Sequence, residues 1–320
     1  LRGEFAFALY DHEQERLILV RDRFGIKPLY YRLQDDELIW GSEVKAILEH
    51  PGVPHRLDAR AAVHQVMQVM VPGSTSFEGV EALLPGHMLI VERKGDRLEA
   101  RTQQYWDFVF PEQDRIPSVQ EAEQDAQRYI DGVRERLIDA VATRLEADVP
   151  VGCYLSGGID SCSILGLATP MQQSHVKAFT IAFDHTDYDE SAIAREMAER
   201  TQADQEVLKL SADDLYGDSF ITVVRHAERT FYNTLAVAKW HMSRRVRECG
   251  YKVVITGEGS DELFGGYPFY KRDYFLHAAH EAGADDPTSA AGVFHGAILA
   301  EEQKTHPAWE ELCGFTPSWI

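Results

Sequence analysis

The first hundred residues carry apolar runs of strand length separated by short polar turns. Residues 5–10 alternate large and small side chains, and the polar stretch 11–15 separates them from a second apolar run at 17–20. This pattern predicts a β-hairpin. A turn over 21–31 leads into a third strand, and further strands are expected at 38–41, 86–92 and 98–105. Helices are expected at 43–49 and 59–69.

The periodicity changes in the second part of the chain. Over 119–145 the apolar side chains recur at helical spacing, at Tyr129, Val133, Leu137, Val141 and Leu145. Short apolar runs then alternate with helical segments: strands are expected at 151–155, 178–183, 206–210 and 251–256, and helices at 163–168, 190–201, 212–227 and 235–248. Strands separated by helices favour an α/β fold with a parallel sheet, which binds ligands beyond the carboxyl ends of its strands.

A short polar stretch with Pro111 and Pro117 separates the two patterns, as is typical of an interdomain connection. We expect a first domain over 1–110, a linker over 111–118 and a second domain over 119–320. The chain opens at Leu1 inside an apparent strand and ends on Ile320 without a tail. We therefore expect the first domain to be truncated at its N-terminus and the second at its C-terminus.

Residues 150–161, Pro-Val-Gly-Cys-Tyr-Leu-Ser-Gly-Gly-Ile-Asp-Ser, combine a buried strand, a glycine turn and a helix start. Gly157 and Gly158 allow the backbone to approach a ligand, and Asp160 and Ser161 are expected to supply the N-cap of the next helix. A helix N-terminus attracts phosphate. The stretch matches neither the Walker loop nor the Rossmann fingerprint, and Tyr154 occupies a glycine position of the nucleophile elbow. The alternative is an ordinary tight turn between strand and helix.

A second motif, residues 253–267, places three carboxylates within five residues after a buried strand. Such clustering is unfavourable unless a cation compensates, and Mg²⁺ binds one or two carboxylates together with phosphate oxygens. Asp160 and Asp261 are the expected pair, because each lies just beyond a strand end, and Glu258 is then free for another role. A solvated acidic turn that caps the following helix is the alternative.

Composition narrows the functional classes. The formal net charge of −20 argues against a nucleic-acid partner. No apolar run reaches the roughly 18 residues of a membrane span, and no signal peptide is visible. The four cysteines form no Cys-x-x-Cys pair and are expected to be small buried hydrophobic residues in a reducing compartment. We therefore expect a cytoplasmic protein.

Three stretches of the first domain resemble the second half of a class II glutamine amidotransferase domain. They are Gly3-x-Phe5-Ala6-Phe7-Ala8, Arg21-Asp22-x-x-Gly25-x-Lys27-Pro28-Leu29-Tyr30 and Gly41-Ser42-Glu43-x-Lys45-Ala46. The resemblance implies an α+β fold of layered antiparallel sheets, of the N-terminal-nucleophile hydrolase type, that releases ammonia from glutamine. It also implies that Arg21, Asp22 and Gly25 mainly shape a turn. The family's nucleophilic cysteine would lie upstream of Leu1, so no glutaminase residue is assigned.

Ser-Gly-Gly-x-Asp-Ser paired with Gly-Glu-Gly-Ser-Asp-Glu-x-Phe-Gly-Gly-Tyr is similar to the synthetase domain of the glutamine-hydrolysing asparagine synthetases. This resemblance implies a doubly wound α/β fold of the ATP pyrophosphatase (adenine nucleotide α-hydrolase-like) type. The implied reaction is ATP-dependent amidation of aspartate through an aspartyl-adenylate, giving AMP and pyrophosphate. The implied substrates are ATP, aspartate and glutamine or ammonia, with Mg²⁺ as cofactor and a homodimer as a possible assembly.

The resemblance also assigns roles to individual positions. The nucleotide would contact Leu155, Ile181, Thr256 and Gly257, and pyrophosphate would be held by Ser156, Gly157, Gly158 and Ser161. Asp160 and Asp261 would hold Mg²⁺. Glu258 would orient aspartate or ammonia, or act as the base during attack, because ammonia must shed a proton.

Two alternatives stay open. A β-lactam synthetase or lasso-peptide cyclase keeps the same loop but closes a ring on an internal amine. A catalytically silent homologue would bind ATP without turnover. Two further clusters are not expected to be sites. His277-x-x-His280-Glu281 has helical spacing but not the residue order of a zincin, and Lys271-Arg272 is expected to be a solvated helix face rather than a pyrophosphate contact.

Overall fold

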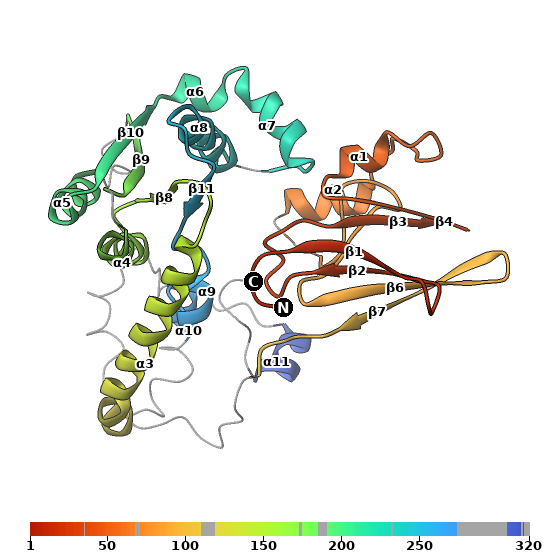
Figure 1. Cartoon of the computed structure of the whole chain (residues 1–320), viewed down its shortest axis with the longest axis horizontal. Helices are drawn as coiled ribbons and strands as arrows, with labels where there is room; N and C mark the ends of the chain where they lie inside the picture. The colour runs from red at the N-terminus through yellow and green to blue at the C-terminus, as the bar shows by residue number, and fades with distance from the viewer. Residues whose placement is uncertain are drawn as a thin grey trace. The chain divides into compact units, whose positions relative to one another are not determined.

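The computed structural model describes residues 1–34, 36–67, 69, 71–109, 119–172, 175–184, 191–231, 233–273, 306–314 and 316. The chain forms two compact units. The first comprises Leu1–Pro111 and Ser211–His241, and the second comprises Glu112–Leu210 and Met242–Ile320. The boundary between the units falls after His241, within the helix α8 (Leu235–Glu248), and Figure 1 labels the elements of both units. The expected linker at 111–118 lies outside the described residues.

A four-stranded antiparallel sheet dominates the first unit, in the order β1-β2-β6-β7. Its strands are β1 (Ala6–Asp11), β2 (Arg16–Arg21), β6 (His87–Lys94) and β7 (Arg97–Gln104). The alternation of side chains along them places Leu19, Leu89 and Val91 in one cluster with Leu29 and Leu83. The expected hairpin and the two later strands are confirmed.

A second, three-stranded antiparallel sheet of the same unit has the order β4-β3-β5. It consists of β3 (Tyr30–Gln34), β4 (Glu37–Gly41) and β5 (Glu81–Ala82), and β5 was not expected from the sequence. Helices α1 (Val44–Leu48) and α2 (Ala59–Val66) follow, and α2 ends three residues before the expected position. Two antiparallel sheets are therefore present, whereas their layered arrangement of the N-terminal-nucleophile hydrolase type stays a prediction.

The turn after β2 is built by the buried carboxylate of Asp22, which is 1% exposed. Its Oδ1 accepts the N–H groups of Phe24 and Ile26 at 3.1 and 3.0 Å, and its Oδ2 accepts that of Lys27 at 2.9 Å. The Arg21 guanidinium donates to three backbone carbonyls, those of Gly25, Lys27 and Leu83. Both side chains of the Arg-Asp pair therefore hold the backbone of the turn.

The segment 211–241 belongs to the first unit, although the elements on both sides of it in sequence belong to the second. The expected single helix at 212–227 is wrong. The structure has α6 (Ala212–Tyr216) and α7 (Ser219–Ala227), separated by Gly217, which leaves the helical region at φ −81° and ψ −159°. A Cβ at this glycine would lie 2.5 Å from the carbonyl oxygen of Asp213. The chain can therefore turn here because residue 217 has no side chain.

A four-stranded parallel sheet forms the centre of the second unit, in the order β10-β9-β8-β11. Its strands are β8 (Val151–Tyr154), β9 (Lys177–Phe183), β10 (Asp204–Leu210) and β11 (Val253–Ile255). On one face, Cys153 and Ala178 pack with residues of α3 (Val119–Leu145), α4 (Ile159–Ala168) and α5 (Ser191–Thr201). On the other face, Phe179 packs against Met242 and Val246 of α8.

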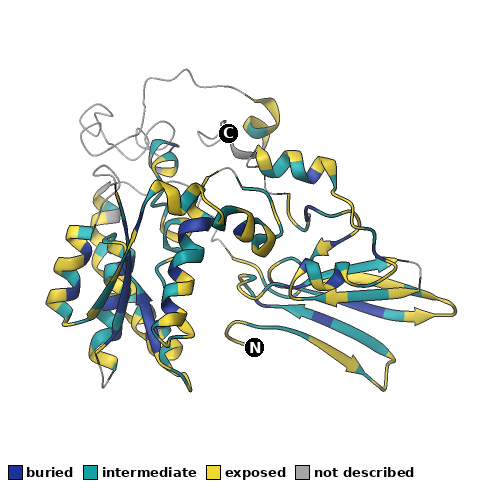
Figure 2. Ribbon diagram, turned by 90° about the horizontal axis from the view of Figure 1, so that it is seen from above, coloured by how far each residue is buried: buried dark blue, intermediate teal, exposed yellow. Residues whose placement is uncertain are grey.

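Helices on both faces of a parallel sheet confirm the doubly wound α/β arrangement, and Figure 2 shows buried residues along these strands. The remaining described helices are η1 (Thr169–Met171), α9 (Ser260–Phe264), α10 (Pro268–Asp273) and α11 (Pro307–Cys313). Within the described parts of the chain, no helix is both long and apolar enough to cross a membrane.

We predict that Asp22→Asn lowers the free energy of unfolding of the first unit by about 1–3 kcal/mol, because an amide group would replace an acceptor oxygen and leave a buried N–H unpaired. Urea unfolding measures this loss. Asp11→Asn is the matched control, since Asp11 also accepts two backbone N–H groups, those of Glu13 and Gln14, but in an exposed turn where water can replace it. Equal losses in the two variants would contradict the role of Asp22.

Candidate functional site

The candidate site begins where β8 ends, at the loop Ser156-Gly157-Gly158. Leu155 is 1% exposed, and its N–H donates to the carbonyl of Phe179 on β9 at 2.8 Å. Gly152 allows this close packing, because a Cβ there would lie 2.8 Å from the Phe179 ring. Gly157 then turns the chain at φ +98°, a conformation that other residues rarely adopt. The sheet thus fixes the point from which the loop starts.

Two serine hydroxyls give the loop its shape. The Oγ atoms of Ser156 and Ser161 lie 3.0 Å apart, and Ser161 also donates to the carbonyl of Gly158 at 3.1 Å. In return, the N–H of Ser156 donates to Ser161 Oγ, and that of Gly158 to Ser156 Oγ, both at 3.2 Å. The loop is therefore closed by its own side chains.

The expected N-cap is wrong. Helix α4 begins at Ile159 with Gly158 as its N-cap, and no side chain caps it. Asp160 lies in the first turn, and the hydroxyl of Ser161 serves the loop instead. The first N–H groups of a helix have no partners within the helix, so the start of α4 offers donors to an anion.

The second motif lies beside the first because β11 pairs with β8 in parallel, with Ile255 opposite Cys153. Thr256 and Gly257 follow the strand. A Cβ at Gly257 would lie 2.7 Å from the Cβ of Asp160 and 3.0 Å from the backbone nitrogen of Ser161. The backbone of the second motif therefore touches the first turn of α4, and this contact is closed to any larger residue at 257.

The acidic side chains of the second motif occupy different environments. Glu258 is exposed, whereas Asp261 is half-buried in the first turn of α9 and contacts Gly266. The hydroxyl of Tyr267 donates to Glu262 Oε1 at 2.8 Å. This hydrogen bond, together with burial and the charges of Glu262, Asp261 and Glu258, raises the pKa of Tyr267 to about 12. The hydroxyl of Tyr267 is therefore protonated at neutral pH and donates to the carboxylate of Glu262.

The described carboxylates are too few for a metal site that the protein fills alone. Among the residues that the structure describes, no three His, Cys, Asp or Glu side chains are grouped closely enough to hold a metal by themselves. A structural zinc or a calcium cage therefore does not fit the described part of the site, because each needs more protein ligands. A pair of carboxylates fits Mg²⁺, which takes most of its remaining ligands from water and phosphate.

The other predicted positions are distributed as follows. Ile181 is half-buried in β9 and packs in the cluster on the α8 face of the sheet. Cys153 is fully buried, and burial raises the pKa of its thiol to about 12, so it stays an inert apolar residue at neutral pH. His277, His280 and Glu281 lie outside the described residues.

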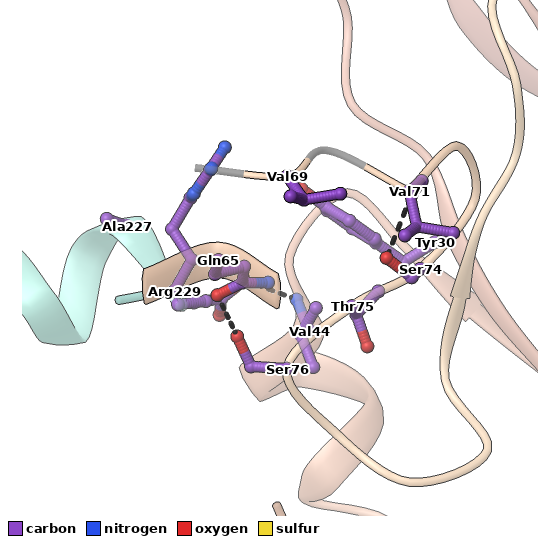
Figure 3. Close-up of a pocket in the computed structure, with 11 residues that line it drawn as sticks. Tyr30, Val44, Gln65, Val69, Val71, Ser74, Thr75, Ser76, Ala227 and Arg229 are labelled. Carbon is purple, nitrogen blue, oxygen red and sulfur yellow. Dashed lines mark hydrogen bonds between the residues drawn. The ribbon is translucent and has the colours of Figure 1, made fainter. Parts of the chain in front are cut away.

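The first unit contains a hollow of about 70 Å³ that sequence reasoning missed. Figure 3 shows its lining, which comes from the β3–α1 region, the α2 region and the end of α7. The lining residues are Tyr30, Val44, Gln65, Val69, Val71, Ser74, Thr75, Ser76, Ala227, Glu228 and Arg229. No local sequence signal marks it, because its walls come from segments far apart in the chain.

Comparisons with known proteins find family matches for both parts of the chain. A profile of the asparagine synthase family matches residues 132–319, and a profile of the glutamine amidotransferase domain matches residues 1–106. The amidase chyE of Penicillium rubens is 37% identical over 294 residues, covering 88% of the chain and 42% of that protein. The glutamine-hydrolysing asparagine synthetase 2 of Bacillus subtilis is 31% identical over 337 residues, covering 98% of the chain and 42% of that protein.

Among solved structures, an NH3-dependent NAD synthetase from Campylobacter jejuni aligns with 43% of the chain and 60% of its own, at 16% identity and a TM-score of 0.31. This likeness is too low to define the fold. The chain spans 42% of the length of both curated relatives described above. The match to more than half of the chain establishes that it belongs to the asparagine synthase family.

Proposed function

We propose that this chain carries the ATP-using site of a carbon–nitrogen ligase that activates a carboxylate as its adenylate and transfers ammonia to it. Aspartate is the proposed acceptor and asparagine the product, with glutamine as the ammonia source in the full-length protein. The second unit is then a sheet of the ATP pyrophosphatase type. The observation that carries the proposal is the approach of Gly257 to Asp160 and Ser161, which brings both motifs to one edge of the parallel sheet.

The residues of the loop suit the binding of phosphates. Gly157 and Gly158 leave the backbone accessible, and no side chain caps the start of α4, so its first N–H groups can serve an anion. Ser156 and Ser161 hold this arrangement before a ligand binds, so no reorganisation is needed when charge develops. The proposed contacts of the nucleotide are Leu155, Ile181, Thr256 and Gly257.

The carboxylates divide the remaining roles. Asp160 and Asp261 would hold Mg²⁺, which would neutralise charge on the phosphates. Glu258 and Glu262 are the exposed carboxylates of the cluster, and Glu262 accepts the hydroxyl of Tyr267, so Glu258 is the one proposed to reach a substrate. Its proposed role is to orient the acceptor or ammonia and to take the proton that ammonia releases when it attacks the adenylate.

The relatives leave the product open, because two that are 37% identical are named amidases, from Penicillium rubens and Gibberella zeae, while others are named asparagine synthetases. Two other outcomes are adenylation followed by ring closure on an internal amine, and ATP binding without turnover.

The test incubates the full-length protein with Mg²⁺-ATP, ammonium and a panel of amino acids, and measures AMP, pyrophosphate and products by mass. Asparagine formed with equimolar AMP supports the proposal. AMP formed with another product would show that the acceptor is not aspartate. The absence of AMP rejects it.

We predict that Gly257→Ala weakens Mg²⁺-ATP binding and costs about 1–3 kcal/mol of stability, because its Cβ forces the two motifs apart. Isothermal titration and thermal unfolding measure the two effects. Gly132→Ala is the control, since a Cβ at this position in α3 meets no atom within 4 Å. An unchanged affinity for ATP in Gly257→Ala would show that the contact is not part of the site.

We predict that Asp160→Ala and Asp261→Ala each lower the rate of AMP formation by on the order of 10²–10³-fold, because each removes charge that stabilises the transferring phosphates. Both variants should remain folded by circular dichroism, and raising the Mg²⁺ concentration should restore little activity. The exposed Asp213→Ala in α6 is the control and should keep the full rate. Wild-type turnover in either site variant would exclude that residue as a metal ligand.

We predict that Glu258→Ala slows amide formation by on the order of 10²–10⁴-fold while ATP still binds, because the loss removes a proton acceptor rather than a phosphate ligand. The measurement compares the product rate with the dissociation constant of Mg²⁺-ATP from a separate binding experiment. Amide synthesis at the full rate would refute the role of Glu258. A loss of ATP binding equal to that in Asp160→Ala would reassign it to the phosphate site.

A further inference from the structure

The last residue before the 229–234 connection, Glu228, has an unusual backbone. It is the C-cap of α7 and adopts the left-handed conformation at φ 54° and ψ 26°. Residues other than glycine rarely adopt this conformation, because it is unfavourable in free energy. It persists where other interactions hold the residue in place. The interactions of its side chain show what holds it.

The carboxylate of Glu228 binds the start of α1, 184 residues earlier in the chain. Its Oε2 accepts the N–H of Val44 at 2.6 Å, and its Oε1 accepts the N–H of Lys45 at 2.7 Å and the Lys45 ammonium at 3.2 Å. The side chain is only 9% exposed. Glu43, the local N-cap of α1, makes no capping bond of its own. Glu228 therefore caps α1 from a distant segment.

Lys45 adds to this cap. Burial alone would lower the pKa of its ammonium, but hydrogen bonds to Glu43 and Glu228 outweigh burial and raise it. Lys45 is thus charged at neutral pH, and its charge compensates the buried carboxylate. Hydrogen bonds between charged groups are the stronger ones, and a buried N–H that loses its partner is costly.

A second contact holds the same segment two residues later. The Oε1 of Gln65 accepts the N–H and the hydroxyl of Thr230 at 3.2 and 3.3 Å, and also the hydroxyl of Ser76 at 2.8 Å. Gln65 lies on α2, which begins a short distance after α1. Gln65 and Glu228 line the hollow of Figure 3 together. The segment is thus fixed to both helices at its turn after α7.

The two sides of this contact belong to different family matches. Helices α1 and α2 lie in the range of the glutamine amidotransferase profile, whereas Glu228 and Thr230 lie in the range of the asparagine synthase profile. After Thr230 the chain continues into α8, whose later residues Met242 and Val246 belong to the core beneath the parallel sheet. The anchored segment and this core are therefore joined through one continuous helix.

We propose that Glu228 is a positioning residue that couples the glutamine-using part of the protein to the amide-forming part by fixing the segment 211–241 on α1. This inference rests on the proposed function. It concerns the efficiency with which ammonia from glutamine is used, and it gives Glu228 no contact with either substrate. Its loss should impair glutamine-dependent synthesis more than ammonium-dependent synthesis.

The first test compares Glu228→Gln and Glu228→Ala with wild type in the full-length protein, using glutamine or saturating ammonium as nitrogen source. We expect Glu228→Ala to lower the rate of glutamine-dependent amide formation about tenfold, because a factor of that size corresponds to the loss of one hydrogen bond to a charged group. The variant should also release more glutamate per amide formed. Ammonium-dependent synthesis should change less than about twofold. Glu228→Gln keeps one acceptor oxygen, so its rate of glutamine-dependent amide formation should lie between those of wild type and Glu228→Ala.

Glu43→Gln is the matched control. Glu43 binds the Lys45 ammonium at 2.9 Å but is largely exposed and makes no bond to the N–H groups of α1, so this variant should keep wild-type coupling. Equal losses with both nitrogen sources in Glu228→Ala would overturn the proposal, because they would mark a general structural role. Wild-type coupling of glutamine use to amide formation in Glu228→Ala would overturn it as well.

The second test does not depend on catalysis. Hydrogen–deuterium exchange at peptides containing Val44, Lys45 and Thr230 should be faster in Glu228→Ala than in wild type and unchanged in Glu43→Gln. Unchanged exchange in Glu228→Ala would overturn the anchoring role. If wild-type protein forms no AMP with either nitrogen source, the proposed function fails, and the exchange result still decides whether Glu228 anchors the segment.

Discussion

The parallel pairing of β8 with β11 is the constraint on which the candidate site depends. It places the ends of two strands side by side, and each strand is followed directly by one of the two motifs. Glycine at 257 then lets the second backbone rest on the first turn of α4. The acidic motif that contains Asp261 thereby begins beside the first turn of α4, the end at which a helix carries partial positive charge.

Much of the fold could be predicted because its signals are local. The spacing of apolar side chains predicted the bounds of α3. The helical segment that ends before Cys249 was likewise predicted with the bounds of α8. The failures have physical reasons. Gly217 ends α6 through a close approach to the carbonyl of Asp213, which no periodicity reveals. Ser161 has the chemistry of a cap, but its hydroxyl is engaged by the preceding loop.

The candidate site was largely visible in the sequence, since its residues are contiguous within each motif and only the pairing of two strands had to be inferred. The cap of α1 was not visible. Glu228 is a single acidic residue in a chain with 52 of them, and its partners precede it by more than half of the chain. Contacts of that range depend on how the segment 211–241 joins the first unit, and a local pattern carries no information about it.

The turn built by Asp22 has a consequence for how amidotransferase sequences are interpreted. Its carboxylate and the Arg21 guanidinium form their hydrogen bonds with backbone groups of the turn and with the carbonyl of Leu83, so the backbone geometry of the turn accounts for the Arg-Asp pair of the signature. A sequence search based on this signature therefore finds proteins that share the turn. It would still find a protein that had lost glutamine hydrolysis, as long as the sheet beneath the turn persisted, so the signature indicates common ancestry rather than activity.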